Sequence, residues 1–191
     1  MIPEKTEGTV EIRWHGRGGQ GAVTSAELVA HAAIGEGKFA QAFPSFGPER
    51  RGAPVLAFNR ISDKQIRIRS AVENPDIVLV LDPRLLDYVD VKAGLKEDSI
   101  VLLNTKKSIN DIKSQYEITN RVGVVNATSI ALATIKLNIV NTTILGLLVK
   151  ATGIIKLESL EAPLKNRFGV AAERNLIACK RAYQESLIEE K

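Results

Sequence analysis

The chain has 191 residues, is 45% hydrophobic and carries a formal net charge of +4 at neutral pH. Its length fits a single domain over residues 1–191 that can bury a core. The charge is small and no basic run alternates with aromatic residues, which argues against nucleic acid as a partner. The first residues lack the apolar segment of a signal peptide, and no apolar run is long enough to span a membrane, so we expect a cytoplasmic protein with no membrane partner.

Cysteine and histidine are too scarce for a metal centre. Cys179 is the sole cysteine, and the two histidines, His15 and His31, have no evident third ligand nearby in the sequence. One thiol cannot form an internal disulfide or supply the four thiolates that an iron–sulfur cluster usually requires. We therefore expect no metal site in this chain. His15 ends a predicted strand, where a structural hydrogen bond is at least as plausible as ligand contact.

Strand-like and helix-like segments alternate along the chain to about residue 135, and the last third is mostly helical. The strands are expected over Val10–His15, Phe39–Phe43, Val55–Arg60, Gln65–Ser70, Asp76–Leu81, Ser99–Asn104 and Val122–Asn126, with 55–60 and 65–70 forming a hairpin. The helices are expected over Gly21–Gly35, Arg84–Lys92, Thr128–Leu137, 142–152 (capped by Asn141 and ended by Gly153), Leu157–Asn166 and Ala171–Leu187.

This alternation predicts an α/β fold, in which helices cover a sheet on both sides to give three layers, α/β/α. The continuous apolar run Asp76–Leu81 is typical of a central strand that is buried on both faces. We therefore expect a mixed, mostly parallel sheet with a Rossmann-like glycine loop after its first strand.

The glycine loop joins the first strand to the first helix and consists of Gly16, Arg17, Gly18, Gly19, Gln20 and Gly21. A strand that turns through glycines into a helix presents backbone N–H groups at the positive end of that helix, where a phosphate binds well. The Arg17 guanidinium and the Gln20 amide are suited to help hold it. The alternative is a tight turn that lets the helix pack on the sheet, because G-x-G-x-x-G is a common pattern.

A second loop, residues 44–52, contains two prolines and two glycines and places Arg50 and Arg51 close to Phe43 and Phe46. Adjacent arginines beside aromatics on a stiff frame favour recognition of a phosphate-bearing ligand or a partner surface over a plain surface loop. A nicotinamide site would need an acidic residue about 20 residues beyond the glycine loop, at the end of the second strand. The chain has Phe39–Ala42 there, which weakens that interpretation.

Taken together, these segments resemble the gamma subunits of the 2-oxoacid:ferredoxin oxidoreductases, most closely those of the pyruvate type. The resemblance covers nearly the whole chain. The segments that carry it are His15–Gly21, Gln41–Val55, Ala57–Ile61, Ile66–Ser70, Asn74–Asp76 and Asn141–Gly146.

The resemblance implies a subunit of an enzyme that oxidatively decarboxylates a 2-oxoacid with coenzyme A and passes electrons to ferredoxin. In that family thiamine diphosphate, magnesium and iron–sulfur clusters would belong to the alpha, beta and delta partners of a heterotetramer. This chain has neither the Gly-Asp-Gly thiamine motif nor a cysteine set, so we expect it to have no catalytic residue and to be inactive alone.

The resemblance also suggests a role in binding coenzyme A. The segment Gly16–Gly21 would hold part of the pyrophosphate, and Arg50 and Arg51 would contact the phosphates or the adenosine end. Pyruvate is the expected substrate, and branched-chain 2-oxoacids are the alternative. A stand-alone NADP-binding or regulatory protein and a pure assembly scaffold remain the competing classes, and the isolated chain could form a homodimer.

Overall fold

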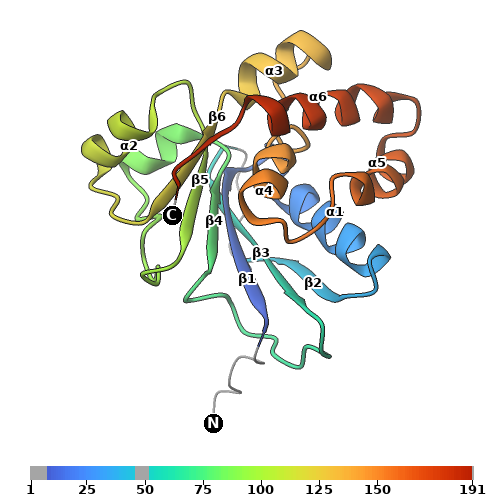
Figure 1. Cartoon of the computed structure of the whole chain (residues 1–191), viewed down its shortest axis with the longest axis horizontal. Coiled ribbons are helices and arrows are strands. Elements are labelled where there is room, and N and C mark those ends of the chain that lie inside the picture. The colour runs from blue at the N-terminus through green and yellow to red at the C-terminus, as the bar shows by residue number, and fades with distance from the viewer. Residues whose placement is uncertain (1–7, 46–51, 191) are drawn as a thin grey trace.

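The computed structural model describes residues 8–45 and 52–190. These residues contain a single seven-stranded sheet with the strand order β2-β3-β1-β4-β5-β6-β7 (Figure 1). The strands are β1 (Val10–Arg17), β2 (Phe39–Pro44), β3 (Pro54–Ser62), β4 (Ile77–Val80), β5 (Ile100–Asn104), β6 (Arg121–Val125) and β7 (Leu187–Ile188). The α-helices are α1 (Ala22–Gly35), α2 (Ile109–Tyr116), α3 (Ala127–Thr134), α4 (Leu145–Thr152), α5 (Glu161–Phe168) and α6 (Ala172–Glu185).

The sheet is parallel at its centre and antiparallel towards both edges. Strands β1, β4, β5 and β6 run parallel to their neighbours in this group. On one side β3 is antiparallel to both β1 and β2, and on the other side β7 is antiparallel to β6. This arrangement confirms the predicted α/β class and the mixed sheet.

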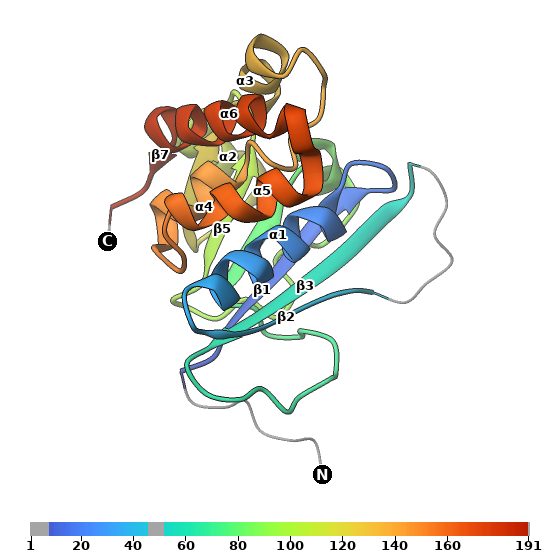
Figure 2. The ribbon, with the colours of Figure 1, turned by 90° about the vertical axis from the view of Figure 1, so that its right-hand side faces the viewer.

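Helices cover both faces of the sheet. The larger core lies between one face and the helices α1, α3, α4, α5 and α6, whereas a smaller core lies between the other face and α2 with the short 3-10 helix η1 (Pro83–Asp87) (Figures 1 and 2). Ile77 and Leu79 of β4 face the larger core, and Val78 and Val80 face the smaller one. The run Asp76–Leu81 therefore contains the doubly covered central strand that its composition predicts.

Helix α1 packs closely on β1 and β3 because its inward face is made of small side chains (Figure 2). Ala22, Ala26 and Ala33 are buried there, as predicted. Beneath the helix the Trp14 indole Nε1 donates to Asn59 Oδ1 at 2.8 Å, and Asn59 Nδ2 donates to the Ala26 carbonyl. The helix and the two strands are thus joined by a buried polar link as well as by apolar contact.

The predicted hairpin of residues 55–60 and 65–70 is wrong. Both edges of β3 are already paired, with β1 and with β2, so no edge remains for a second arm. The chain after β3 instead runs as an irregular segment whose carbonyls accept from side chains, Ile66 from Gln41 and Ala71 from Arg60. Ile68 is nevertheless buried, which explains the alternating pattern in the sequence.

In the middle of the chain one expected helix is absent and one unexpected helix is present. Residues 84–92 do not form an α-helix but a 3-10 helix that ends at Asp87. The Arg13 guanidinium accounts for the missing helix. It donates to the carbonyls of Val91 and Ala93, which therefore do not accept helical hydrogen bonds. Helix α2 was not expected; it is short, buries only Ile112 and depends on a capping box at its start.

The helical C-terminal third is confirmed with changed boundaries. Helix α4 begins at Leu145, and Asn141 does not cap it, because its Oδ1 accepts from the adjacent Thr142 N–H within a preceding turn. Gly153 ends α4 as predicted, with a positive φ of 60°. Helix α6 ends at Glu185, and the next residues pair with β6 instead of continuing the helix. Within the described residues, no helix has the length and apolarity to cross a membrane.

Candidate functional site

The glycine loop lies where the parallel strands end. The carboxyl ends of β1, β4, β5 and β6 meet at one edge of the sheet because these strands are parallel. The connection after β1 passes through α1 on one face, and the connection after β4 passes through η1 on the other. Neighbouring parallel strands whose connections leave to opposite faces open a crevice between them, and ligands of α/β proteins bind there.

Backbone hydrogen bonds fix the shape of the glycine loop. The N–H of Gln20 donates to the Arg17 carbonyl at 2.9 Å, and the Arg17 N–H donates to the Gln20 Oε1 at 2.8 Å. Gly18 donates to the Ala53 carbonyl and accepts from the Gly52 N–H. The loop is therefore a closed turn that continues the pairing of β1 with β3 by one more step.

Asp82, directly after β4, holds the polar side chains of the loop. Its buried carboxylate accepts from Arg17 Nε at 2.8 Å and from Gln20 Nε2 at 3.1 Å. Arg84 adds bonds from its backbone N–H and its guanidinium. In this conformation the two side chains that were expected to hold a phosphate are bound to Asp82, so the loop offers a ligand mainly its backbone N–H groups.

The cations around Asp82 determine its protonation. Burial alone would raise the pKa of this carboxyl group, but the hydrogen bonds from Arg84, Arg17 and Gln20 outweigh burial and hold the pKa well below its ordinary value. Asp82 is thus ionised at neutral pH. Nothing in the sequence pattern singles it out except its place, a carboxylate that follows a buried apolar run and precedes a proline.

Two glycines of the loop have conformations that other residues rarely adopt. Gly19 has a φ of 91°, and Gly21, which precedes the first residue of α1, has a φ of 82°. A Cβ on Gly21 would lie 2.5 Å from Asn141 Nδ2, whereas a Cβ on Gly19 would meet nothing within 4 Å. Asn141 is therefore seated against the start of α1, and its carbonyl accepts from the Ser25 hydroxyl at 3.0 Å.

The start of α1 has the features of an anion site. No side chain caps the helix, so the first N–H groups are not satisfied by a capping side chain. The loop borders a hollow of about 270 Å³ that is lined by Gly19 and Gln20 after β1, Asp82 and Arg84 after β4, Asn104 at the end of β5 and Thr128 of α3. These segments meet because the connections after β1 and β4 leave to opposite faces of the sheet.

A neighbouring hollow of about 560 Å³ extends the crevice towards α2 and shares Arg84, Asn104 and Thr128 with the first. It adds the exposed side chains Lys106 and Lys107. Asn104 is the fixed point between the two, because its amide donates to the Leu81 carbonyl and its Oδ1 accepts from the Thr128 N–H. The two hollows together present Arg84, Lys106 and Lys107, beside the carboxylates of Asp82 and Asp87.

Arg50 and Arg51, the other predicted site residues, lie outside the described residues. The structure does place Gly52, which follows Arg51 in the sequence, against the glycine loop. Its N–H donates to the Gly18 carbonyl at 3.3 Å, and its own carbonyl accepts from Arg17 Nη1 at 3.3 Å. The end of the second loop and the glycine loop therefore meet.

The topology differs from that of a dinucleotide-binding unit. In that unit the second strand lies parallel to the first and next to it. Here the strand after α1, β2, is antiparallel to β3 and is separated from β1 by it. Strand β2 contains no acidic residue and does not adjoin β1, so it supplies no ribose-binding carboxylate beside the loop, which counts against the NADP interpretation.

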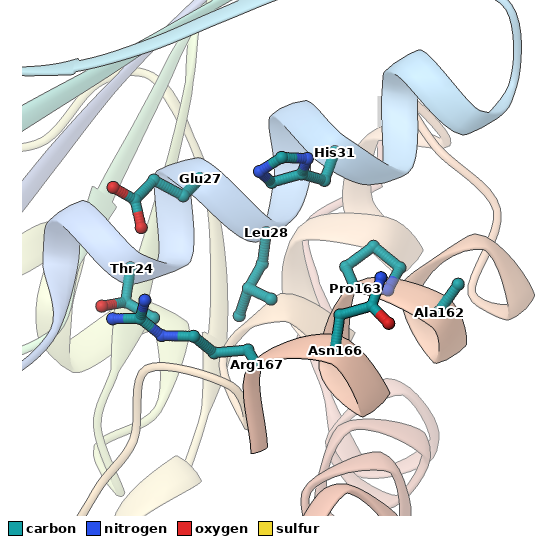
Figure 3. Close-up of a pocket in the computed structure, with 8 residues that line it drawn as sticks. All are labelled: Thr24, Glu27, Leu28, His31, Ala162, Pro163, Asn166 and Arg167. Carbon is teal, nitrogen blue, oxygen red and sulfur yellow. The ribbon is translucent and has the colours of Figure 1, made fainter. Parts of the chain in front are cut away.

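Histidine does not form a metal site in the part of the chain that the structure describes, where no group of three or more potential ligands gathers. The buried His15 accepts from Arg13 Nε through its Nε2 at 3.1 Å, which is the structural hydrogen bond considered above. His31 lies instead on the outer surface of α1. It borders a hollow of about 320 Å³ between α1 and α5, in which Arg167 extends towards Thr24 (Figure 3).

The comparisons with known proteins agree with this geometry. The family model described as pyruvate ferredoxin/flavodoxin oxidoreductase matches residues 11–185. The pyruvate/ketoisovalerate oxidoreductases common subunit gamma of Pyrococcus abyssi is 52% identical over 181 residues, which cover 94% of this chain and 98% of the relative. The pyruvate synthase subunit PorC of Thermotoga maritima is 48% identical, covering 92% and 93% of the two chains.

Solved structures give the same result. The crystal structure of pyruvate oxidoreductase subunit PORC from Thermotoga maritima superposes with a TM-score of 0.86 at 42% identity, covering 96% of this chain and all of the other. The 2-oxoglutarate:ferredoxin oxidoreductase of Magnetococcus marinus shares the fold, with a TM-score of 0.75 at 18% identity over 31% of its length. The chain therefore belongs to the pyruvate ferredoxin/flavodoxin oxidoreductase family, as a gamma subunit of a 2-oxoacid:ferredoxin oxidoreductase.

Proposed function

We propose that this gamma subunit, with residues 1–191 as one domain, supplies part of the coenzyme A site of a complex that oxidises pyruvate. The complex converts pyruvate and coenzyme A to acetyl-CoA and carbon dioxide and passes the electrons to ferredoxin. Thiamine diphosphate, magnesium and the iron–sulfur clusters are held by alpha, beta and delta partners. The chain alone is inactive because it provides no group for the carbon chemistry.

The observation that carries this proposal is the crevice at the strand ends, which presents Lys106 and Lys107 and has the uncapped start of α1 beside it. Coenzyme A is an extended molecule with a pyrophosphate and a further phosphate. The backbone of Gly16–Gly21 would hold the pyrophosphate. Arg50 and Arg51 would reach the same ligand because Gly52 is hydrogen bonded to Gly18. Arg17 and Gln20 would contribute through the loop shape that Asp82 maintains.

The names of the relatives support the reaction. The Pyrococcus relative is described as common to pyruvate and ketoisovalerate oxidoreductases, and the Thermotoga relative as a subunit of pyruvate synthase. The Magnetococcus enzyme that shares the fold was solved with coenzyme A bound. Pyruvate is accordingly our first choice of substrate. Branched-chain 2-oxoacids are the second, because a common gamma subunit leaves the choice of oxoacid to its partners.

The first experiment is a tagged pull-down of this chain from its host, assayed for pyruvate- and coenzyme A-dependent reduction of a viologen dye. Activity with thiamine- and cluster-bearing chains retained supports the proposal. A solitary chain, without dye reduction, that binds NADPH saturably at micromolar concentrations would support the stand-alone alternative instead.

The second experiment replaces Arg50 and Arg51 by alanine in the assembled complex. Charge-assisted contacts are each worth about 1.5–3 kcal/mol, so we expect the apparent KM for coenzyme A to rise at least about tenfold. The KM for pyruvate should stay unchanged. Arg67 and Arg69 are exposed and lie outside the crevice, so replacing both by alanine is a control with the same loss of charge. An unchanged coenzyme A dependence in a correctly assembled Arg50/Arg51 variant would overturn the assignment.

A further inference from the structure

A separate hollow of about 410 Å³ lies on the face of β1 that points away from α1. Successive residues of a strand point to opposite faces. Trp14 therefore faces the larger core, and Arg13 and His15 face the other side. The hollow is lined by these two side chains, by Ser45, by Leu56 and by Val89 and Asp90 beyond η1. It shares no described lining residue with the hollow beside the glycine loop.

Arg13 brings a buried positive charge to this hollow. Its guanidinium is only 6% exposed and donates to the carbonyls of Glu73, Val91 and Ala93 and to His15 Nε2. None of the described carboxylates is within ion-pair distance of it, but Asp90, which also lines the hollow, interacts with it electrostatically and partly offsets the effect of burial on its pKa. Four acceptors serve five N–H donors, so one donor is left over. A buried charge that has no directly paired carboxylate is costly, and an anion bound against the guanidinium would offset that cost.

His15 supplies a second donor. Its side chain is 4% exposed, and its Nε2 accepts from Arg13, so the proton of the neutral imidazole lies on Nδ1. Within the described part of the chain Nδ1 has no acceptor. Burial and the adjacent Arg13 charge lower the pKa of His15 to about 3, so it stays a neutral donor at physiological pH. An imidazole in this state can bind an oxygen atom without adding charge.

The remaining walls restrict what fits. Leu56, Leu85 and Val89 make an apolar side, and Ser45 adds a hydroxyl. The exposed carboxylate of Asp90 is the one acidic side chain among the described lining residues, and it opposes an incoming anion. A ligand that matches both the Arg13 and His15 donors and the apolar side carries one carboxylate and a short hydrocarbon group.

We propose that this hollow binds a small carboxylic acid with a short apolar tail, with its carboxylate on Arg13 and His15 and its tail against Leu85 and Val89. Gly16 of the glycine loop also lines this hollow, so the hollow adjoins the proposed coenzyme A site. The coenzyme A assignment does not use Arg13 or His15, so either assignment can fail without the other. Its geometry places the remaining Arg13 donor and the His15 Nδ1 donor beside an apolar wall, an arrangement that favours a small carboxylate over a ligand with several phosphates.

The test uses the full chain and a pair of probes of matched shape, isobutyrate and isobutyramide. Titration is followed by nuclear magnetic resonance of the His15 imidazole and by calorimetry. We expect saturable binding of isobutyrate, and at least about tenfold weaker binding of the amide, because the neutral amide cannot form a charge-assisted hydrogen bond with Arg13. Equal affinity for the two probes would overturn the proposal.

Substitutions at Asp90, Asp98 and His15 sharpen the test. Asp90→Asn removes the opposing charge and should tighten isobutyrate binding about two- to fivefold at low salt. Asp98→Asn makes the same charge change at an exposed position outside the hollow and should leave the affinity unchanged. His15→Phe removes the Nδ1 donor and should weaken binding about fivefold or more. Identical affinities for Asp90→Asn and Asp98→Asn would count against a carboxylate on Arg13.

The last test measures isobutyrate binding to the assembled oxidoreductase. Isobutyrate should bind to the complex as it does to the chain, and coenzyme A should not compete with it. Binding to the isolated chain that disappears in the complex would show that a partner subunit fills the hollow, and competition by coenzyme A would show that the two sites are one. Either result would overturn the proposal.

Discussion

At the scale of single residues, Asp82 is the group on which the glycine loop depends, and Asp82→Asn tests it. The substitution leaves the partly exposed Arg17 without its buried counter-charge; breaking a fully buried ion pair costs about 3–5 kcal/mol, so the lower end of that range applies here. We expect a loss of about 3 kcal/mol at pH 7 in the free energy of unfolding, measured by urea denaturation. The exposed Arg84 pair contributes little to this figure.

The pH dependence of the same variant gives a second check. The folded-state pKa of Asp82 is depressed, so the stability that its charge contributes is present above the ordinary carboxyl pKa of about 4. It is lost as the pH falls below that value. The difference between the native chain and Asp82→Asn should therefore shrink between about pH 4 and pH 2, and a constant difference would contradict the role given to this carboxylate. Asp98→Asn serves as the control for lost charge.

At the scale of elements, the crossing of α4 and α6 depends on Gly146. A Cβ at this position would lie 2.1 Å from the Cys179 carbonyl oxygen and 2.6 Å from the Tyr183 nitrogen. Both atoms belong to the backbone and cannot move aside cheaply, so Gly146→Ala should cost at least about 3 kcal/mol of unfolding free energy. Gly35, in the last turn of α1, has open space around it, and Gly35→Ala should stabilise the chain by up to about 1 kcal/mol. Similar thermal shifts for both variants would contradict the close approach of the two helices.

The loop that joins β1 to α1 allows a similar comparison. Gly19 and Gly21 both have positive φ, but only a side chain on Gly21 would collide with Asn141. Gly19→Ala should therefore cost about 1 kcal/mol, from backbone strain alone. Gly21→Ala should cost clearly more, and the difference measures the collision. Chemical denaturation of the two variants under the same conditions gives both numbers, and equal losses would place Asn141 further from the helix start.

At the scale of the whole molecule, the sheet should open from its edges. β4 and β5 are buried on both faces, whereas β7 has two residues and β2 is only partly buried. Hydrogen exchange followed by mass spectrometry should show the slowest amides in β4 and β5 and the fastest strand amides in β7 and β2. Uniform protection across the sheet would show instead that both edges are as stable as the centre.

The layered fold and the place of the loop were predictable because they depend on local patterns. A continuous apolar run marked β4, and glycines between a strand and a helix marked the loop. The pairing of β3 was not predictable, because Ile66 and Ile68 alternate with arginines as a strand would, and only the occupied edges of β3 forbid one. The role of Asp82 was not predictable for the same reason, because its partners Arg17 and Gln20 are distant in sequence and contact it only in the folded chain.

Trp14 determines what tryptophan fluorescence reports when the chain unfolds. It is the single tryptophan of the chain and is fully buried on β1, with its indole bonded to Asn59. The tryptophan fluorescence of the protein, excited selectively over that of its three tyrosines, therefore comes from one place, the larger core beneath α1. A red shift of its emission reports the loss of that core, whereas loosening of α2 and the smaller core leaves the signal unchanged. Fluorescence and circular dichroism will coincide only where both cores unfold together.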